Sequence, residues 1–503
     1  MTVGTAGTGA ALPPALPPQL ARTHLIGIGG AGMSGVARIV LARGGAVSGS
    51  DAKDSHGLRA LRALGAKVSV GHAAANLDQL DAGPTTIIST KAVHQTDPYN
   101  PELLEGARRG IPVIHRSTAL AALMSGYRVV CVTGTAGKTS TTSMLTGALQ
   151  HCGADPSFLI GGALTGSASG AHHGSGDTFV AEADESDGTF LAYSPDLAVV
   201  TNVEADHLDH HGTIEAYIAS FDAFVAGLAP DAVLIANADD PGSAALAGRA
   251  SGSGVRVRRY GRAVQQGSED LRLLSYAPAG DRGTAMVALT GPDGLECRVQ
   301  LEIPVPGEHM ASNALAALLA GVELGAPLPG LLAGLAGYRG VRRRFEFKGQ
   351  AGGVRVYDDY AHHPAKVAAA LRGARQVVGE GRLLVAFQPH LYSRTRDVAA
   401  GFGAALGLAD AVLLLDVYGA REEQLPGVTG GMIAVAVPLA GSCVHYEPRR
   451  ADVPARLAAL VRTGDVVVTM GAGDVTALGP ELLAELVRRC PDPADSASRV
   501  VGP

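Results

Sequence analysis

The sequence lacks a strong charge excess and a long apolar run. Its 47 acidic and 41 basic residues give a net charge of −6 over 503 residues, which argues against nucleic acid as the main partner. No stretch reaches the roughly 18 apolar residues that a membrane-spanning helix needs, and the nearest, residues 430–446, is interrupted by Pro438. We therefore expect neither a nucleic-acid-binding protein nor a membrane span.

Cysteine is also scarce. Five cysteines stand at wide spacings with no C-x-x-C pair, which is typical of reduced thiols in a cytoplasmic protein. Residues 1–21 lack the charged and apolar segments of a secretory signal, and we expect flexible tails at 1–21 and 491–503. No internal repeat of 20 to 50 residues indicates a solenoid.

The composition and the length of the chain are typical of a globular protein of several domains. Hydrophobic residues make up 47% and charged residues 17%, far from the composition of disordered proteins. At about 150 residues per domain, the length suggests three domains. Glycine is abundant, with 67 of the 503 residues, against a usual share of roughly 7%. The excess is either background composition or a sign of turns where the backbone approaches a ligand closely.

Short apolar runs alternate with helical patterns, which predicts parallel α/β sheets. We expect domains at 22–126, 127–337 and 338–490. The expected strands are 23–28, 46–50, 67–70, 85–89 and 111–114, then 128–132, 179–181, 197–201 and 232–236, and finally 354–358, 383–387, 411–416 and 466–470. Residues 254–303 differ, because apolar and polar residues alternate there as in antiparallel strands with one wet face.

The first glycine turn follows the first strand. Residues 27–32 read G-x-G-x-x-G and precede a helical pattern, and Asp51 stands about twenty residues further on. Such glycines let backbone amides reach a diphosphate at a helix N-terminus, and the acid lies where a Rossmann fold binds ribose. The pattern leaves three alternatives open: a nicotinamide cofactor, a UDP-sugar, or a turn that only reverses the chain.

The second glycine turn, Gly134 to Thr139, lies between the strand at 128–132 and a helix. It is a shortened phosphate-binding loop, since Val132 stands where the full motif has its first glycine. Backbone amides can hold phosphates, Lys138 can neutralise the β- and γ-oxygens, and the Thr139 hydroxyl can bind Mg²⁺. The alternative is a chance lysine at a helix start.

Two acidic clusters follow strands of the second domain, at 182–187 and 202–211. Ligands of α/β sheets bind at the carboxyl ends of strands, and carboxylates this close together need cations to offset their repulsion. The alternative is a pair of solvated loops. His207, in the second cluster, is either a ligand or a helix cap.

The third domain has polar side chains at the ends of two strands, within 357–364 and 387–395. Arg394 is suited to binding a carboxylate through two hydrogen bonds. These residues could equally form salt bridges between domains.

In this order, the two glycine turns, the acidic clusters and the histidine-rich third domain resemble the Mur ligase family of peptidoglycan synthesis. The resemblance spans about residues 22–490. It rests on the stretches HLIGIGGAGMSG, SGSDAKDS, IPVIHRS, GTAGKTSTTSML, EADESDGTF, VVTNVEADHLDHHG, RRRFEFKG, DDYAHHP, FQPHLYSRT, DVYGARE and MGAGDV. EADESD and GIGGAGMSG are similar to the branch that adds L-alanine to UDP-N-acetylmuramate.

The resemblance implies an α/β fold of three domains: a Rossmann-like UDP-binding domain, a central P-loop ATPase-like domain with a mostly parallel sheet, and a Rossmann-like C-terminal domain. In the first domain it implies that the UDP-N-acetylmuramate diphosphate binds at Gly27, Gly29, Gly30 and Gly32, with Asp51 and His72 near the nucleotide. Among the alternatives for the first glycine turn, the resemblance therefore favours a UDP-sugar over a nicotinamide cofactor.

In the other two domains the resemblance implies sites for Mg-ATP and for the amino acid. ATP would contact Gly134, Thr135, Ala136, Gly137, Lys138 and Thr139, with Asn313 near the adenine. Mg²⁺ would be held by Thr139, Glu182 and His207. L-alanine would lie near Tyr360 and His362, with its carboxylate on Arg394.

The implied reaction uses ATP to convert the lactyl carboxylate into an acyl phosphate, which the amine of L-alanine then attacks. Positioning and charge neutralisation carry such phosphoryl transfer, so no nucleophilic side chain is needed. The catalytic residues implied are Lys138, Glu182, His207, His362 and Arg394. The chain would act as a monomer or a homodimer.

The chain departs from the family's usual residues at four positions. Ala136 replaces a histidine, Leu391 an arginine, and Glu308 and Met310 an arginine and an asparagine. Two alternatives to the alanine-adding ligase therefore remain: a related ligase for another amino acid or peptide, and a catalytically weakened nucleotide-binding relative. The retention of Lys138 and of the expected metal ligands argues against the second.

Overall fold

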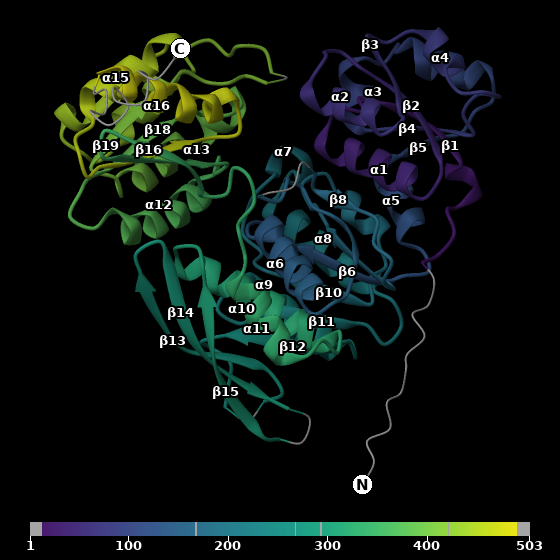
Figure 1. The fold of residues 1–503 in the computed structure, drawn as a ribbon, viewed down its shortest axis with the longest axis horizontal. Coiled ribbons are helices and arrows are strands. Elements are labelled where there is room, and N and C mark those ends of the chain that lie inside the picture. Colours follow the sequence, from purple (N-terminus) through teal and green to yellow (C-terminus); the bar gives the residue numbers. More distant parts are fainter. Residues whose placement is uncertain (1–12, 166–168, 267, 292–293, 421, 490–503) are drawn as a thin grey trace, which may run out of the picture. The chain divides into compact units, whose positions relative to one another are not determined.

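A computed structural model describes residues 13–165, 169–266, 268–291, 294–420 and 422–489 (Figure 1). The chain divides into two compact units. The first comprises residues 1–274, 286–301 and 312–339, and the second comprises residues 275–285, 302–311 and 340–503. The first unit contains the two glycine turns and the two acidic clusters, and the second contains the histidine-rich strand ends.

The first unit begins with a five-stranded parallel sheet in the order β3-β2-β1-β4-β5. Its strands are β1 (Arg22–Ile26), β2 (Ala46–Asp51), β3 (Lys67–Val70), β4 (Thr86–Ser89) and β5 (Val113–His115), and its helices are α1 (Ala31–Ala42), α2 (His56–Ala63), α3 (Lys91–Thr96), α4 (Pro101–Arg108) and α5 (Arg116–Met124). The order reverses between β1 and its neighbours β2 and β4, so this edge has the switch point at which α/β sheets bind ligands.

Part of the expected N-terminal tail lies within the described residues. A short 3₁₀ helix, Pro18–Leu20, precedes β1, and Leu20 is fully buried. The Arg43 guanidinium donates to the carbonyl oxygen of Pro14 at 2.7 Å. Residues 13–21 therefore pack against the first sheet, whereas residues 1–12 and 490–503, which cover the rest of the expected tails, lie outside the described residues.

A ten-stranded sheet, in the order β15-β14-β13-β12-β11-β10-β6-β9-β7-β8, forms the next part of the chain. Its strands are β6 (Arg128–Thr133), β7 (Ser157–Leu159), β8 (Ala171–His172), β9 (Thr178–Glu182), β10 (Leu197–Val200), β11 (Val233–Asn237), β12 (Arg256–Gly261), β13 (Leu271–Ala279), β14 (Arg282–Thr290) and β15 (Glu296–Ile303). Its helices are α6 (Lys138–His151), α7 (Leu208–His211), α8 (Ile214–Ala226), α9 (Pro241–Gly252), α10 (Glu308–Glu323) and α11 (Leu328–Ala336).

The prediction of antiparallel strands over 254–303 is wrong for its first strand. β12 pairs in parallel with β11 along its length and with β13 over two residues. Its crossover from β11 runs through α9, and such a crossover brings the chain back in the same direction. The antiparallel pattern begins with β13 and β14, which are joined by only two residues, as in a hairpin.

The second unit is built on a six-stranded sheet in the order β16-β17-β21-β18-β19-β20. Its strands are β16 (Glu346–Ala351), β17 (Val354–Asp359), β18 (Leu383–Phe387), β19 (Ala411–Leu414), β20 (Val444–Tyr446) and β21 (Val466–Met470), and its helices are α12 (Pro364–Val378), α13 (Tyr392–Leu406), α14 (Gly430–Ala436), α15 (Val453–Leu460) and α16 (Leu478–Arg489). Among the strands that the structure describes in this sheet, only β16 runs antiparallel to its neighbour.

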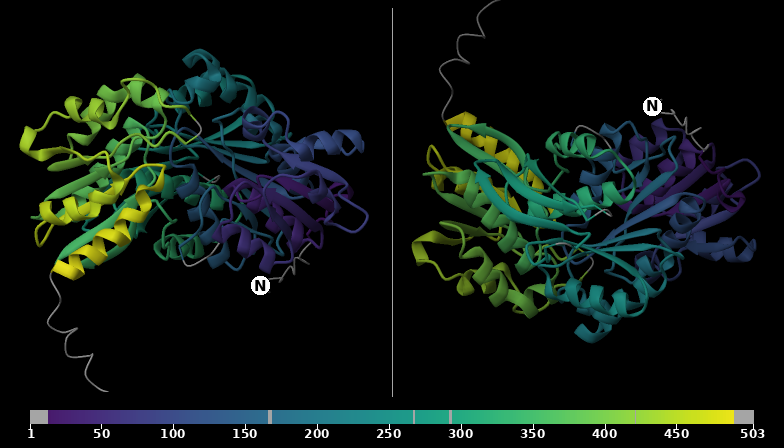
Figure 2. Two further views of the ribbon diagram at one scale, coloured as in Figure 1. Left: turned by 90° about the horizontal axis from the view of Figure 1, so that it is seen from above. Right: turned by 90° about the horizontal axis from the view of Figure 1, so that it is seen from below.

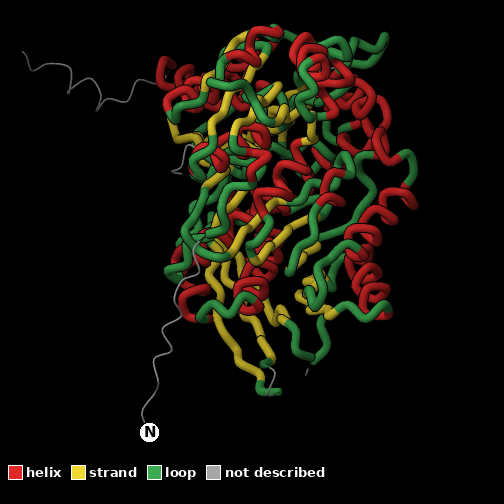
Figure 3. Tube along the Cα trace, turned by 90° about the vertical axis from the view of Figure 1, so that its right-hand side faces the viewer, coloured by secondary structure: helices red, strands yellow, loops and turns green. Residues whose placement is uncertain are grey.

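The α/β fold with a parallel first sheet and mixed sheets after it is confirmed. β3, β18 and β21 begin and end at the predicted residues. In the second unit, separate apolar clusters lie on the two faces of the sheet, one under α12 and α13 and one under α15 and α16. Figures 2 and 3 show helices packed beside the sheets, except around the protruding strands β13, β14 and β15, which are labelled in Figure 1. Burial on both faces explains why the central strands of the second unit, β18 and β21, are continuous apolar runs.

In the part of the chain that the structure describes, no helix is long and apolar enough to cross a membrane. The four cysteines within that part, Cys131, Cys152, Cys297 and Cys443, are all free thiols.

Replacing Phe402 by alanine tests the core of the second unit. Phe402 is 1% exposed and its ring lies 5.0 Å from that of Phe387, so F402A should lower the free energy of unfolding by about 3–5 kcal/mol. Phe347 of the same unit is 55% exposed, and F347A should cost less than about 1 kcal/mol. Urea unfolding followed by circular dichroism measures both, and equal losses would contradict this account of the core.

Candidate active site

The phosphate-binding loop connects β6 to α6 and depends on glycine at two positions. Gly134 and Gly137 both have positive φ, +129° and +85°. A side chain at Gly134 would collide with Thr201, and one at Gly137 would collide with the amide of Asn313. The loop therefore has little freedom to change shape, and Asn313, expected near the adenine, lies directly against it.

Residues that directly follow β10 form hydrogen bonds with the phosphate-binding loop. The Asn202 side chain accepts a hydrogen bond from the Ala136 amide at 2.8 Å, and the Thr201 hydroxyl donates to the Ala136 carbonyl at 2.6 Å. The Thr135 hydroxyl lies 2.9 Å from the hydroxyl of Tyr217, which is fully buried. Neither Asn202 nor Tyr217 was singled out from the sequence, because both are distant from the motif along the chain.

Lys138 is the first residue of α6, and its amino group is fixed by three oxygens. Nζ donates to the carbonyl of Gly134 at 2.8 Å and to Glu185 Oε2 at 2.6 Å, and it lies 3.5 Å from Asp184 Oδ1. Burial would lower the pKa of Lys138, but the carboxylates of Glu185 and Asp184 outweigh burial and raise it. The lysine is therefore a fixed positive charge at the loop.

Glu185 connects the lysine to the rest of the site. Its side chain is completely buried, and besides Lys138 it accepts a hydrogen bond from Tyr217 at 3.4 Å. The ring of His211 contacts its backbone carbonyl at 2.9 Å. Glu185 belongs to the first acidic cluster, but its position in the sequence does not distinguish it from the other carboxylates of that cluster.

The expected metal ligands are only partly brought together. The Thr139 hydroxyl donates to Glu182 Oε1 at 3.0 Å, and Glu182 Oε2 accepts the amide of Gly161 at 2.7 Å. His207 Nε2 instead lies 3.6 Å from Asp206 and 4.0 Å from Glu185. Among the described residues, no three His, Cys, Asp or Glu side chains are arranged to hold a metal ion. A hydroxyl and a carboxylate are still suitable oxygen ligands for Mg²⁺, which keeps several waters and binds phosphate oxygens.

The first glycine turn meets the end of β2. The amides of Gly27 and Ile28 donate to the carbonyl of Ser50 at 2.8 and 3.0 Å, and the amide of Gly29 donates to Asp51 Oδ2 at 2.9 Å. Gly27 has a φ of +75°, which favours glycine. The structure therefore brings Asp51 to the turn, as the Rossmann pattern predicts.

Two further residues, Arg116 and His72, lie near the first glycine turn, at the carboxyl edge of the first sheet. Arg116, at the start of α5, lies so close to Gly32 that a side chain there would collide with its guanidinium. His72, after β3, is hydrogen-bonded to the Ser50 hydroxyl at 2.9 Å. Gly30 begins α1 as its N-cap. Arg116 was not predicted as a site residue, since its position depends on the packing of α5 against α1.

In the second unit, the residues expected around an amino acid cluster at the ends of β17 and β18. The ring of Tyr360 lies 4.9 Å from that of His362 and 4.8 Å from the Arg343 guanidinium. Burial, with the nearby charges of Lys366 and Arg394, lowers the pKa of His362 well below its usual value. His362 is therefore neutral at physiological pH, and Arg394 is close enough to influence it electrostatically.

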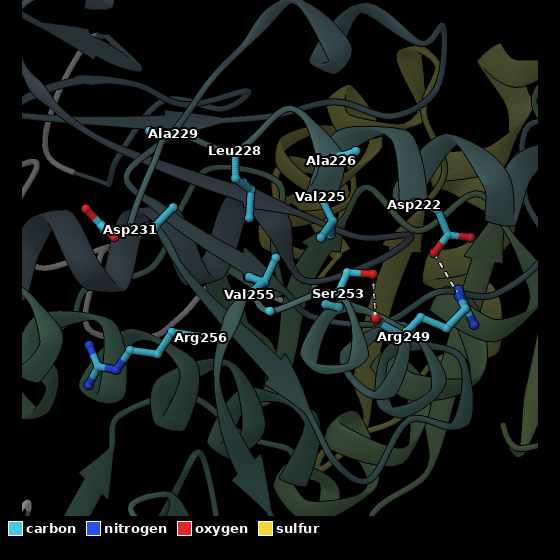
Figure 4. Close-up of a pocket in the computed structure, with 13 residues that line it drawn as sticks. Asp222, Val225, Ala226, Leu228, Ala229, Asp231, Arg249, Ser253, Val255 and Arg256 are labelled. Carbon is cyan, nitrogen blue, oxygen red and sulfur yellow. Dashed lines mark hydrogen bonds and ion pairs between the residues drawn. The ribbon is translucent and has the colours of Figure 1, made fainter.

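A surface hollow of about 680 Å³ lies elsewhere in the first unit (Figure 4). It is lined by the ends of α8 and α9 and by residues that precede β11 and begin β12. Its two arginines are paired, Arg249 with Asp222 at 2.8 Å and Arg256 with Glu323 at 3.0 Å. The hollow is at the amino ends of these strands, opposite to the edge at which parallel sheets bind ligands, so it is not the candidate active site.

Comparison with known proteins identifies three family models along the chain. The model described as the Mur ligase family, catalytic domain matches residues 22–128, the Mur ligase middle domain matches 132–321, and the Mur ligase, glutamate ligase domain matches 343–473. Together they span most of the described sequence.

Individual relatives match almost the whole chain. The UDP-N-acetylmuramate–L-alanine ligase of Saccharopolyspora erythraea is 60% identical over 469 residues, covering 93% of this chain and 94% of that protein. The ligase of the same name from Rhodococcus jostii is 54% identical and covers 94% and 97%.

Among solved structures, the UDP-N-acetylmuramate-alanine ligase MurC of Thermotoga maritima is similar with a TM-score of 0.74 and 27% identity, covering 93% of this chain and 99% of that one. A murein peptide ligase from Psychrobacter arcticus has the same fold, with a TM-score of 0.67 and 24% identity over 93% and 98%.

Gly137 provides a test of the phosphate-binding loop. G137A should lower the affinity for Mg-ATP at least tenfold, because the residue has a positive φ and no room for a methyl group beside Asn313. Gly147 lies ten positions further on, within α6, with open space around it, so G147A should leave the affinity unchanged. Calorimetric titration with Mg-ATP measures both. Equal affinities of G137A and G147A would show that the loop does not bind the nucleotide.

Proposed function

The chain belongs to the Mur ligase family, and we propose that it joins L-alanine to the lactyl carboxylate of UDP-N-acetylmuramate at the expense of ATP. The products are UDP-N-acetylmuramoyl-L-alanine, ADP and phosphate, and the reaction belongs to the synthesis of peptidoglycan precursors. The observation that carries the proposal is the nearly full-length likeness to ligases of this name. The phosphate-binding loop, with its fixed lysine, supports it.

The reaction needs an activated carboxylate. A carboxylate is a poor acylating agent, so one lactyl oxygen first attacks the γ-phosphorus of ATP and ADP leaves. The amine of L-alanine then attacks the acyl carbon, the bond from that carbon to the phosphate oxygen breaks, and phosphate leaves as the amine loses a proton. Both steps depend mainly on positioning and on charge neutralisation.

For ATP we propose that the amides of the loop 134–139 and the amino group of Lys138 bind the phosphates. The three oxygens around Lys138 Nζ are its partners in the structure, so the β- and γ-phosphate oxygens would replace or join the carboxylates of Asp184 and Glu185. Because the lysine is already desolvated and fixed, little reorganisation is needed when charge develops on the transferred phosphoryl group. Asn313, against Gly137, would face the adenine.

For Mg²⁺ we propose Thr139 and Glu182 as the residues that hold the ion, with His207 further from them. The proposal is supported by the hydrogen bond between the Thr139 hydroxyl and Glu182, because two oxygen atoms that could bind the ion lie side by side there. When bound, Mg²⁺ would supply neutralisation of the phosphate charge.

For the two other substrates we propose the strand ends already described. The diphosphate of UDP-N-acetylmuramate would bind the glycine turn at Gly27, Gly29, Gly30 and Gly32, with Asp51 and His72 near the nucleoside. In the second unit, L-alanine would lie near Tyr360 and His362 with its carboxylate on Arg394. A neutral His362 can accept a hydrogen bond from the amino group of L-alanine.

We propose in addition that the enzyme acts in the cytoplasm, where ATP is available and thiols stay reduced. The four free cysteines of the described chain support this location.

The lysine tests the reaction. K138A should lower phosphate release in the presence of Mg-ATP, UDP-N-acetylmuramate and L-alanine by a factor on the order of 10²–10³, because the γ-phosphoryl charge loses its fixed counter-charge. Lys67 is half-exposed and lies 3.9 Å from Asp81, so K67A is the matched control and should keep full activity. Should wild type release phosphate equally well with other amino acids in place of L-alanine, the assignment to alanine would be wrong.

Glu182 tests the metal assignment. E182Q removes one negative oxygen from the pair with Thr139, so the Mg²⁺ concentration for half-maximal phosphate release should rise at least tenfold. Glu215, exposed in the first turn of α8, is the control, and E215Q should leave this concentration unchanged. A Mg²⁺ titration of both variants decides, and an unaltered midpoint for E182Q would exclude it as a ligand.

A further inference from the structure

A buried polar cluster lies next to the carboxyl ends of β2 and β3 in the first sheet, where we propose that the nucleotide binds. At its centre is Glu102, the second residue of α4, whose side chain is completely buried. Its Oε2 accepts the Ser50 hydroxyl at 2.6 Å and lies 3.4 Å from His24 Nε2, while its Oε1 accepts the side-chain amide of Asn76 at 2.5 Å. The amide of Ala73 also donates to Oε1 at 3.3 Å.

These partners keep Glu102 ionised. Burial alone would raise the pKa of Glu102, but the nearby ring of His24 and the hydrogen bonds from Ser50 and Asn76 outweigh burial and lower it. Its place at a helix N-terminus also favours negative charge. An ionised carboxylate can only accept hydrogen bonds, so the short contact between Ser50 Oγ and Glu102 Oε2 contains the proton of the serine.

The proton of Ser50 in turn determines the tautomer of His72. A hydroxyl has one proton, and that of Ser50 is directed to Glu102. The contact of 2.9 Å between Ser50 Oγ and His72 Nδ1 must then be donated by the histidine. In the neutral ring the proton is therefore on Nδ1, and Nε2 carries a lone pair.

His72 presents this lone pair at the position expected for a base. The strand order β3-β2-β1 places the glycine turn after β1, Asp51 at the end of β2 and His72 after β3, so successive strand ends would follow a nucleotide from phosphate through ribose to base. The His72 side chain is 22% exposed, whereas Glu102 is not exposed at all. Within the described chain, Nε2 of His72 has no hydrogen-bond partner.

We propose that Ser50 and Glu102 are positioning residues that hold His72 as a hydrogen-bond acceptor for the N3–H group of uracil, and so select uridine over cytidine nucleotides. Uracil has a proton on N3, whereas N3 of cytosine has a lone pair, which would face the lone pair of Nε2. The inference rests on the proposed function, because it takes the nucleotide of UDP-N-acetylmuramate to bind this edge.

The tautomer can be read in the wild-type protein without any ligand. In ¹⁵N-histidine-labelled protein at pH 8, the signals of His72 should show a protonated Nδ1 and an unprotonated Nε2. Loss of these signals in H72Q assigns them. A His72 with the proton on Nε2 would overturn the inference, and no other variant is needed for this result.

Ser50 and Ser48 provide a matched pair of variants. Both are fully buried on the same face of β2, and each contacts one histidine, Ser48 Oγ lying 2.8 Å from His24 Nδ1. The dissociation constants of UDP and CDP, measured by titration, give the base preference. S50A should lower the preference for UDP at least tenfold, because Nδ1 of His72 loses its acceptor at 2.9 Å and keeps only the more distant Glu102 Oε2, at 3.5 Å. S48A should change it less than twofold.

The variant Glu102→Gln should reverse the preference between UDP and CDP, which a merely structural role of Glu102 does not predict. Ala73 and Asn76 both donate to the Oε1 position, so the amide oxygen of the glutamine stays there and its NH₂ group faces Ser50. Ser50 then donates to His72 Nδ1, the ring proton moves to Nε2, and Nε2 becomes a donor. E102Q should therefore prefer CDP over UDP and show the reversed ¹⁵N pattern.

The outcomes separate this inference from the proposed function. Unchanged UDP preference in both S50A and E102Q would overturn the positioning role, even in an enzyme that ligates L-alanine normally. Failure of wild type to release phosphate would refute the ligase, while the nucleotide titrations, which need no turnover, still measure base preference.

Discussion

The structure of the loop at residues 134–139 depends on one buried positive charge, that of Lys138. Lys138 Nζ is placed between Glu185, Asp184 and the carbonyl of Gly134, and removing both carboxylates would leave a desolvated charge uncompensated. Because Glu185 also contacts Tyr217, and Tyr217 contacts Thr135, the lysine, the acidic cluster and the loop form one network. The proposed phosphoryl transfer would use the same charge that stabilises this network.

A second network performs an analogous task at the first sheet. There a buried carboxylate, Glu102, is compensated by neutral donors and by contact with His24 rather than by a lysine. In both places a buried acid determines how an exposed or ligand-facing group is presented, the lysine amino group in one case and His72 in the other. In the proposed complex the two glycine turns would hold phosphates at these edges, where glycine is favoured by the positive φ or by the close approach of neighbouring groups.

The elements that the sequence predicted best are strands buried on both faces. Residues 67–70, 383–387 and 466–470 are short apolar runs between turns, and their local pattern determines their ends. The direction of β12 was not predictable, because alternation of apolar residues reports one wet face but not which neighbour the strand pairs with. Similarly, Asn202, Tyr217 and Glu102 escaped notice, since their contacts join residues distant along the chain. The proximity of Thr139 and Glu182 followed from adjacent parallel strands, whereas His207 lies nearer to Glu185.

The most direct test of the central claim follows an oxygen atom. With both oxygens of the lactyl carboxylate labelled with ¹⁸O, transfer of the γ-phosphoryl group to that carboxylate must leave one label in the released phosphate and one in the new amide carbonyl. Mass spectrometry of the phosphate measures this. One ¹⁸O atom per phosphate is the predicted result, and phosphate without label would contradict the acyl-phosphate reaction.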